Sequence, residues 1–371
     1  MKNKLLTGAG VLALAVLFAV PSRSTAVDLF EWTQLGRLGE STGPQPYVSA
    51  IAAHPVDPDV LYTGSLLTTD SAALVYRSGD AGESWSAAAE GLPDDLPAFA
   101  GVNDLLLLPG VGGAADTLLV GLDMAGVWRS DNSAQSWQSA AGGSIAGTDT
   151  VQALAGDGGA LFALTSGGVH RAPAGGGEWE KLGNGLPDAG DIFYFDLAAD
   201  PTTAGVLYAA TAPTGLYRTA DNGDTWYPAN GDLPGAGYNL REVSVSPITG
   251  EVFVAMRGTG LFRSADGGRT WLASNAGITY STTLFGMVGA PVLCYTDPDI
   301  AYTFNSDGVF RSQDGGHTWS PFAAGLTSTE TISTLAFHSA RPHIVYAGTS
   351  ISGMWKLSLL PGGQYFLPIV R

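Results

Sequence analysis

The stretch Ser264-Ala265-Asp266-Gly267-Gly268-Arg269-Thr270-Trp271 decides the fold of this chain, because its pattern recurs along the sequence. The pattern is Ser/Thr-x-Asp-x-Gly-x-Thr/Ser-Trp, and further complete copies lie at 78–85, 219–226 and 312–319. The aspartate of such a stretch accepts hydrogen bonds from turn amides, and the glycine takes a positive φ. Each copy therefore predicts a tight hairpin whose tryptophan opens the next strand and packs inward.

We expect these motif residues to be structural, because a residue that recurs once per unit at a hairpin tip is most simply a turn residue. They are Asp80, Asp221, Asp266, Asp314, Trp85, Trp226, Trp271 and Trp319. Two units depart from the pattern. One has Asn132 and Ala134 in place of the aspartate and glycine, and the next reads Ala174-Gly175-Gly176-Gly177.

A short block with a basic third residue precedes each motif and has seven copies, at 75–78, 127–130, 169–172, 216–219, 261–264, 309–312 and 354–357. The tryptophans that follow six of them, from Trp85 to Trp319, are spaced by 52, 42, 47, 45 and 48 residues. This spacing is typical of one four-stranded propeller blade per repeat. The chain is therefore expected to be an all-β, seven-bladed β-propeller over residues 27–358.

The two ends of the chain predict how the ring closes. No such motif follows Trp355, whereas Glu31-Trp32-Thr33-Gln34-Leu35 resembles Glu178-Trp179-Glu180-Lys181-Leu182. We expect the N-terminal segment to be the outer strand of the blade formed by residues 331–357, because this pairing leaves no open sheet edge.

The first 26 residues have the pattern of a secretory signal peptide. Lys2 and Lys4 precede an apolar run from Leu5 to Val20, and Ser24-Thr25-Ala26 supplies small residues for cleavage. A membrane anchor is the alternative, although the run is shorter than the roughly 20 residues of a span. We expect a secreted or extracytoplasmic protein without a membrane span after cleavage, with a short C-terminal tail over 359–371.

Composition narrows the possible partners and cofactors. The formal net charge of -17 disfavours nucleic acid and anionic lipid. Cys294 is the only cysteine, and the five histidines show no metal-ligand spacing, so no metal or cofactor is expected. We expect a monomer whose stability comes from packing.

The repeated motif resembles the BNR or Asp-box propellers, which include sialidases, xyloglucanases, sortilin-type receptors and the photosystem II assembly factor family. The resemblance covers residues 28–357 and implies the fold more than an activity. A sialidase would carry Arg-Ile-Pro, which is absent, and xyloglucanases pair two propellers. The assembly factors carry an arginine-rich patch, whereas this chain is acidic.

Three acids hold equivalent positions near the start of a strand in three repeats: Asp104, Asp196 and Glu242. Near the central channel, two such carboxyls could act as the acid and base of a glycosidase. The alternative is that they bind strand amides at the channel wall. Asp70 and Asp123, in nearby turns, could extend such a site.

Other residues on the face opposite the Asp-box hairpins are candidates for ligand binding. Arginines could clamp a carboxylate or phosphate, and tyrosines could stack on sugars or peptide side chains. The candidates are Arg37, Arg241, Arg257, Tyr47, Tyr194, Tyr238 and Tyr280. Ion pairing for the arginines, and filling of the gaps between blades for the aromatic residues, are the alternatives.

The sequence leaves three functions open. The first is a non-catalytic binding or scaffold propeller that recognises a protein, peptide or glycan. The second is a glycoside hydrolase of the sialidase or xyloglucanase type, and the third is an assembly factor similar to the photosystem II family. The sequence favours the first function, so a non-enzyme is expected over an enzyme, and an enzyme would be a glycoside hydrolase.

The motif generates a test of its own role. Asp266→Ala should lower the melting temperature without abolishing ligand binding, because turn amides lose their acceptor. Asp221→Ala repeats the measurement at a second hairpin. Loss of binding at an unchanged melting temperature would instead make the motif a functional site.

Overall fold

The computed structural model describes residues 31–39, 44–66, 73–98, 100–187, 193–234, 239–279, 289–322, 324–326 and 331–358. The expected signal peptide, residues 1–26, and the expected tail, residues 359–371, lie outside these ranges. The same is true of Asp70, Tyr238 and Tyr280.

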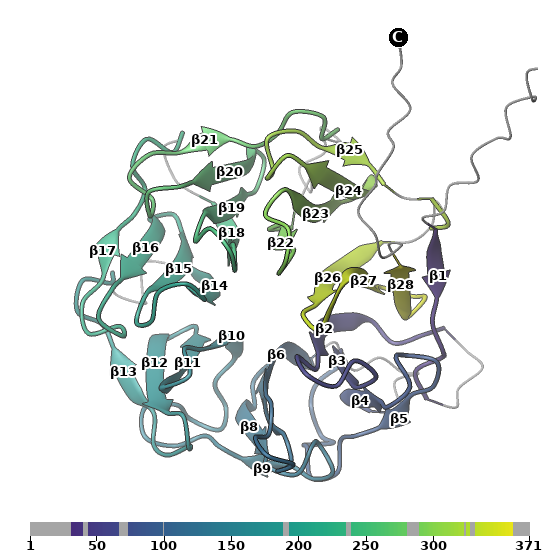
Figure 1. Ribbon diagram of the computed structural model, residues 1–371. Coiled ribbons are helices and arrows are strands. Elements are labelled where there is room, and N and C mark those ends of the chain that lie inside the picture. The colour runs from purple at the N-terminus through teal and green to yellow at the C-terminus, as the bar shows by residue number, and fades with distance from the viewer. Residues whose placement is uncertain are drawn as a thin grey trace, which may run out of the picture.

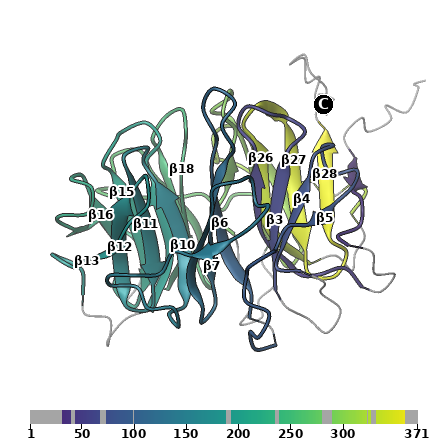
Figure 2. The ribbon, with the colours of Figure 1, turned by 90° about the horizontal axis from the view of Figure 1, so that it is seen from below.

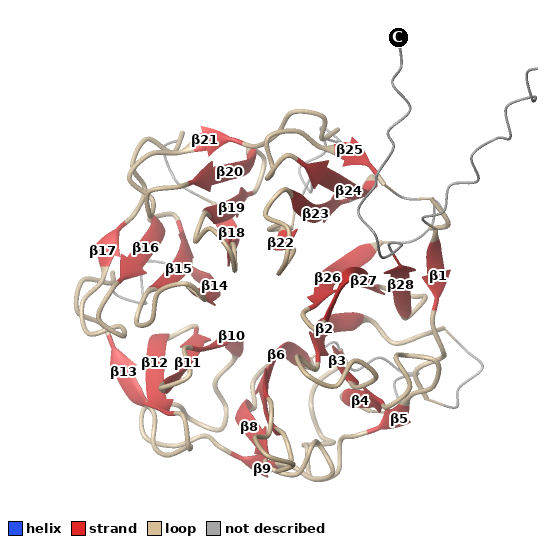
Figure 3. Cartoon of the chain, viewed as in Figure 1, coloured by secondary structure: helices blue, strands red, loops and turns tan. Residues whose placement is uncertain are grey.

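Seven four-stranded antiparallel sheets form a closed ring (Figure 1). The part of the chain that the structure describes holds strands and turns but no helix (Figure 3). The prediction of an all-β, seven-bladed propeller is confirmed. In each blade the first strand lies nearest the centre and the fourth lies at the rim.

The first four blades have these strands: β2 (Val48–Ala53), β3 (Leu61–Ser65), β4 (Val75–Ser78) and β5 (Ser86–Ala87) in blade 1; β6 (Val102–Leu108), β7 (Thr117–Leu122), β8 (Gly126–Ser130) and β9 (Gln138–Ser139) in blade 2; β10 (Val151–Gly156), β11 (Ala160–Thr165), β12 (Gly168–Pro173) and β13 (Glu180–Leu182) in blade 3; β14 (Phe193–Ala199), β15 (Leu207–Ala212), β16 (Gly215–Thr219) and β17 (Tyr227–Pro228) in blade 4.

The other three blades have these strands: β18 (Leu240–Val245), β19 (Val252–Met256), β20 (Gly260–Ser264) and β21 (Leu272–Ala273) in blade 5; β22 (Val292–Leu293), β23 (Ile300–Asn305), β24 (Gly308–Gln313) and β25 (Ser320–Pro321) in blade 6; β26 (Ile332–His338), β27 (Arg341–Thr349), β28 (Met354–Ser358) and β1 (Trp32–Gln34) in blade 7.

Blade 7 closes the ring with strands from both ends of the chain. Strand β1 pairs antiparallel with β28, with Trp32 opposite Leu357 and Gln34 opposite Trp355. The N-terminal strand thus covers an edge that β28 would otherwise expose. The predicted closure is confirmed.

The ring has two faces, and Figure 2 shows the strands running between them. The hairpins between strands 3 and 4 lie beside the turns between strands 1 and 2, as the bond from Ala81 N to Asp59 O shows. We call this side the hairpin face. The opposite side is the one where strand 1 of each blade begins, and we call it the bulge face.

The hairpin motif forms a dense hydrogen-bond cluster. In blade 5, Asp266 Oδ1 accepts from Ser264 Oγ at 2.8 Å and from Thr270 N at 2.9 Å. Its Oδ2 accepts from Thr270 Oγ1 at 2.7 Å. The bonds from Thr270 and Ser264 lower the pKa of this carboxyl to about 2. These contacts are those of a turn stabilised by its own side chains.

The hydrophobic core lies between neighbouring blades rather than inside any one of them. Second strands such as β3 and β19 are buried along their whole length. One cluster of buried residues joins Tyr76 of blade 1 to Tyr346 of blade 7 across the closure. Each blade therefore buries its apolar surface only when both neighbours are present.

The tryptophans connect the blades at the rim. Five of them donate the indole Nε1–H to a carbonyl of the preceding blade: Trp137 to Ala88 at 2.7 Å, Trp179 to Ala140 at 2.9 Å, Trp271 to Ala229 at 3.1 Å, Trp319 to Ser274 at 2.9 Å, and Trp32 to Phe322 at 3.1 Å. A buried indole needs such an acceptor. Two described tryptophans of these hairpins differ: Trp85 donates to Gly82 O of its own hairpin at 3.1 Å, and the buried Nε1 of Trp226 has no acceptor in the described part of the chain.

This difference supplies a matched comparison. Trp319→Phe and Trp226→Phe remove the same volume from side chains that are 3% and 1% exposed, but only Trp319 loses a hydrogen bond. Trp319→Phe should therefore lower the free energy of unfolding by about 1 kcal/mol more than Trp226→Phe. Urea denaturation of the two variants measures the difference, and equal losses would contradict the role given to the indole.

Candidate functional site

A β-bulge lies near the start of strand 1 in most blades. The register shifts between Val102 and Asp104 in β6, between Tyr194 and Asp196 in β14, and between Leu240 and Glu242 in β18. Strands β2, β10 and β26 have the same irregularity. A bulge inserts one extra residue and turns its side chain in a new direction. These bulges give the bulge face its name.

The residues inside the bulges meet in a cavity of about 450 Å³ at the centre of the ring. They are Ser49, Asn103, Gln152, Phe195, Arg241 and Ser333. The three acids predicted from the sequence, Asp104, Asp196 and Glu242, line the same cavity. The channel cavity, as we name this space, thus collects side chains from strands far apart in the sequence.

Each acid of the channel cavity is bonded to the next blade. Asp104 Oδ2 accepts from Leu154 N at 2.7 Å, and Asp196 Oδ2 accepts from Val243 N at 2.8 Å. Glu242 Oε2 accepts from Ala290 N at 2.6 Å. Asp104 and Asp196 also accept the amide of the residue that follows each of them, at 2.8 Å. Asp104 and Asp196 therefore join strand 1 of one blade to strand 1 of the next, and Glu242 joins β18 to the residues just before β22.

Burial changes the protonation of these acids. The side chains are only partly exposed, and they open onto a confined space in which few waters can solvate a charge. Burial raises the pKa of Asp196 to about 8; the bond from Val243 opposes this shift, and the charges of Glu242 and Asp104 add to it. Burial likewise raises the pKa of Glu242 to about 7, and it raises the pKa of Asp104. At neutral pH much of this acidic group is protonated.

A guanidinium stacks on an aromatic ring in the same cavity. Arg241 of blade 5 places its Cζ 3.9 Å from the centroid of the Phe195 ring of blade 4. Burial, and then the charge of Arg257, lower the pKa of Arg241. The Nε of Arg241 is buried and has no hydrogen-bond partner among the described residues. A flat cation is thus held in the channel with donor capacity to spare.

The structure also describes the other predicted residues, which lie in different places. Tyr47, before β2, has its pKa raised by burial and by the charge of Glu242, which lies in blade 5 across the ring (Figure 1). Tyr194 is 5% exposed, packs between blades 3 and 4, and donates to Pro187 O, so it fills the gap between blades.

Arg37 and Arg257 do not line the channel cavity. Arg37 directly follows Gly36, whose amide donates to Gly82 O in the hairpin of blade 1. Asp123 accepts from Thr150 Oγ1.

Sequence reasoning missed most of the bulge residues. Phe195, Asn103 and Gln152 stand directly before the position of the acids, where simple alternation would point them away from the acid side chains. Only the bulge brings them to the same space. The sequence did contain one signal: in each of these repeats the bulge residue directly precedes the position that the acids occupy in blades 2, 4 and 5.

No group of three or more His, Cys, Asp or Glu side chains among the described residues could hold a metal ion. No described helix is long and apolar enough to cross a membrane.

Comparison with known proteins identifies the class of fold. No protein-family model and no curated protein matches the sequence. Among solved structures, the chain is similar to the GH74 xyloglucanase from Xanthomonas campestris, with a TM-score of 0.66 and 18% identity, over 88% of this chain and 53% of the xyloglucanase. The chain thus spans about half the length of that enzyme.

Two further structures share the fold. YCF48 bound to D1 peptide has a TM-score of 0.61 and 15% identity, over 89% of this chain and 95% of YCF48. The extracellular domain of a putative one component system from B. thetaiotaomicron has a TM-score of 0.62 and 12% identity, over 88% of this chain and 40% of that domain. The fold that all these proteins share is the propeller.

The raised pKa of Asp196 predicts how stability depends on pH. Because the folded chain holds this proton up to about pH 8 and the unfolded chain releases it near 3.8, the stabilisation that this carboxyl contributes is fully present below pH 3.8 and is lost as pH rises through 8. The free energy of unfolding should fall as pH rises from 5 to 7, and Asp196→Ala should make this fall shallower by up to about 1.4 kcal/mol per pH unit. Denaturation in urea across this range checks it, and unchanged slopes would contradict it.

Proposed function

We propose that this chain is a non-catalytic, extracytoplasmic binding or scaffold propeller that recognises a protein, peptide or glycan at the channel cavity. The observation that carries the proposal is the pairing of all three carboxyls with strand amides of the neighbouring blade. A catalytic acid or base must turn its oxygen toward the substrate. Here those oxygens hold the ring together.

Arg241 and Phe195 are the residues that we expect to meet the ligand. Their stacked side chains offer guanidinium donors and a ring edge within one cavity. A carbonyl, hydroxyl or carboxylate of a ligand would complete the bonding of the guanidinium. The structure of YCF48 bound to D1 peptide is a case in which a propeller of this shape takes a peptide.

The extracytoplasmic location rests on the N-terminal sequence. Lys2, Lys4 and the apolar run that ends at Val20 have the pattern of an export signal. The similar domain from B. thetaiotaomicron is described as extracellular, which agrees with this location.

Peptide and glycan arrays probed with the mature chain test the proposal. For any ligand found, Arg241→Gln and Phe195→Leu should weaken binding about tenfold or more, because each removes a direct contact. Arg37→Gln is the matched control, since Arg37 does not line the channel cavity. Equal effects of all three substitutions would place recognition elsewhere.

A glycoside hydrolase is the second candidate. It is favoured by the protons that Asp196 and Glu242 retain near neutral pH in one cavity, and by the similarity to the xyloglucanase. Hydrolysis of xyloglucan or fluorogenic glycosides, lost in the double variant Asp104→Asn and Asp196→Asn, would establish it in place of the binding function. The first proposal expects no hydrolysis above the buffer rate.

A further inference from the structure

One interface of the ring, between blades 2 and 3, is built differently from the others. In the complete hairpins the motif glycine abuts the preceding blade just beyond its tryptophan. Gly268 of blade 5 meets Ala229 of blade 4 in this way, and Gly223 of blade 4 meets Leu182 of blade 3. These contacts close the rim between adjacent blades.

Blade 3 lacks this contact because its hairpin has Ala174-Gly175-Gly176-Gly177 in place of the motif. Its two residues with positive φ are Gly176 at 89° and Gly177 at 144°, one position later than Gly267 and Gly268 in the complete motif. Gly176 therefore faces the guanidinium of Arg129 in blade 2. A cavity of about 490 Å³ opens at this interface, which we name the rim cavity.

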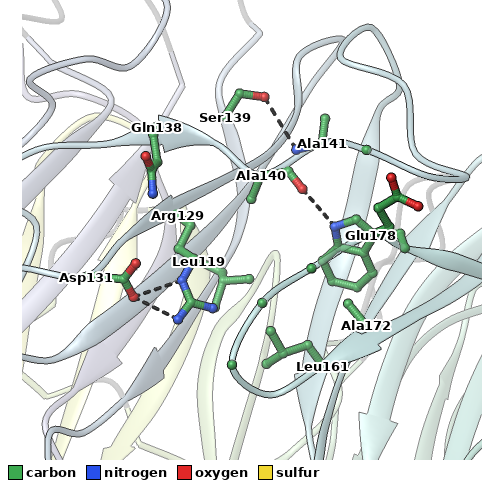
Figure 4. A pocket seen from close by; sticks show the side chains of 15 residues that line it. Leu119, Arg129, Asp131, Gln138, Ser139, Ala140, Ala141, Leu161, Ala172 and Glu178 are labelled. Atoms are coloured by element: carbon green, nitrogen blue, oxygen red, sulfur yellow. Dashed lines mark hydrogen bonds and ion pairs between the residues drawn. The ribbon is translucent and has the colours of Figure 1, made fainter.

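The rim cavity has an apolar wall and polar edges (Figure 4). Ala140 and Ala141 form the accessible wall, with the buried Leu119 and Leu161 behind them. Figure 4 shows Gln138 and the Arg129–Asp131 pair on one side and Glu178 on the other. A second hollow of about 250 Å³ shares Arg129, Asp131 and Gln138, so the depression continues along the outer strand of blade 2.

The charges around the rim cavity are unequally matched. Asp131 Oδ1 accepts from Nε and Nη2 of Arg129, both at 2.8 Å, so this pair is neutral as a unit. Glu178 is exposed and has no hydrogen bond or ion pair in the described part of the chain. The site therefore carries one uncompensated negative charge on a protein whose formal net charge is -17.

From this geometry we propose that the rim cavity binds a lysine or arginine side chain of a partner polypeptide. The methylene stem lies against Ala140 and Ala141, since such stems bury readily along apolar surface. The cationic head reaches the Glu178 carboxylate. The adjoining hollow gives room for the neighbouring residues of the partner.

A sugar fits this cavity less well. Sugar rings bind to open aromatic faces, but Trp137 and Trp179 are only 6% and 4% exposed, so neither offers an open ring face. An acidic ligand would be repelled by Glu178 and by the charge of the whole molecule. A lysine or arginine side chain fits both features, because its methylene stem packs on Ala140 and Ala141 and its positive charge complements Glu178.

The experiment titrates the protein, labelled with ¹⁵N at its tryptophan indoles, with the capped peptide Ac-Gly-Gly-Arg-Gly-Gly-NH₂. The indole signal of Trp179 should shift on binding, while that of Trp319 in blade 6 should not. The same peptide with neutral citrulline in place of arginine should not bind. Glu178→Gln should weaken binding about tenfold, because a charge-assisted hydrogen bond is lost.

Matched variants separate the cavity from general charge attraction. Glu83→Gln removes the same charge from another exposed hairpin residue and should change affinity less than about twofold. Gly142→Trp and Gly175→Trp fill the rim cavity without strain, because an added Cβ meets nothing at either position, and they should abolish binding. Gly183→Trp, equally unhindered but outside the cavity, should not.

Three results would overturn the proposal. They are equal loss of affinity in Glu178→Gln and Glu83→Gln, unchanged binding in the filled variants, and a Trp179 shift caused by a neutral cello-oligosaccharide but not by the arginine peptide. Because the rim cavity lies apart from the channel cavity, none of these results bears on the function proposed there.

Discussion

The hydrogen bond from a tryptophan indole to the preceding blade is the interaction on which the ring depends. A four-stranded sheet cannot bury both faces alone, so each blade needs its neighbours. The indole of Trp137 fills the gap between blades 1 and 2, and its bond to Ala88 sets how closely they approach. The same contact recurs at four further interfaces of the rim, through Trp179, Trp271, Trp319 and Trp32. The acids of the channel cavity likewise connect neighbouring blades at the centre, where Asp196 joins β14 to Val243 of β18.

The same carboxyls illustrate how a propeller can hold polar groups at its centre without chemistry. Strands radiating from one axis leave the first strand of each blade with amides that have no partner on the channel side. A carboxyl that accepts such an amide from the next blade, as Glu242 does from Ala290, satisfies the amide and joins two repeats at once. Burial then holds the proton on the acid. A raised pKa, which in a cleft would suggest a catalytic acid, here follows from a structural position.

The sequence was sufficient to predict the fold because one short block recurs seven times along it. The short block with a basic third residue predicted the number of blades, and the likeness of Trp32 to Trp179 predicted the closure. The grouping of Asp104, Asp196 and Glu242 in one cavity also followed from their equivalent positions. Arg37 was harder to place, because its position relative to the centre depends on the turn that follows β1. Phe195 was missed, because the bulge that turns it toward the channel has no composition of its own.

Closure by β1 and β28 also sets the order in which the molecule can be completed. Strand β1 precedes the other strands of the ring along the chain and β28 follows them, so β1 is synthesised well before its partner. Until β26, β27 and β28 have been made, β1 has no sheet to join and blade 1 has one bare side. The contact of greatest sequence separation is therefore the one that forms last, and topology of this kind folds slowly. A nascent or truncated chain would carry two unpaired edges at once, each able to pair with another copy.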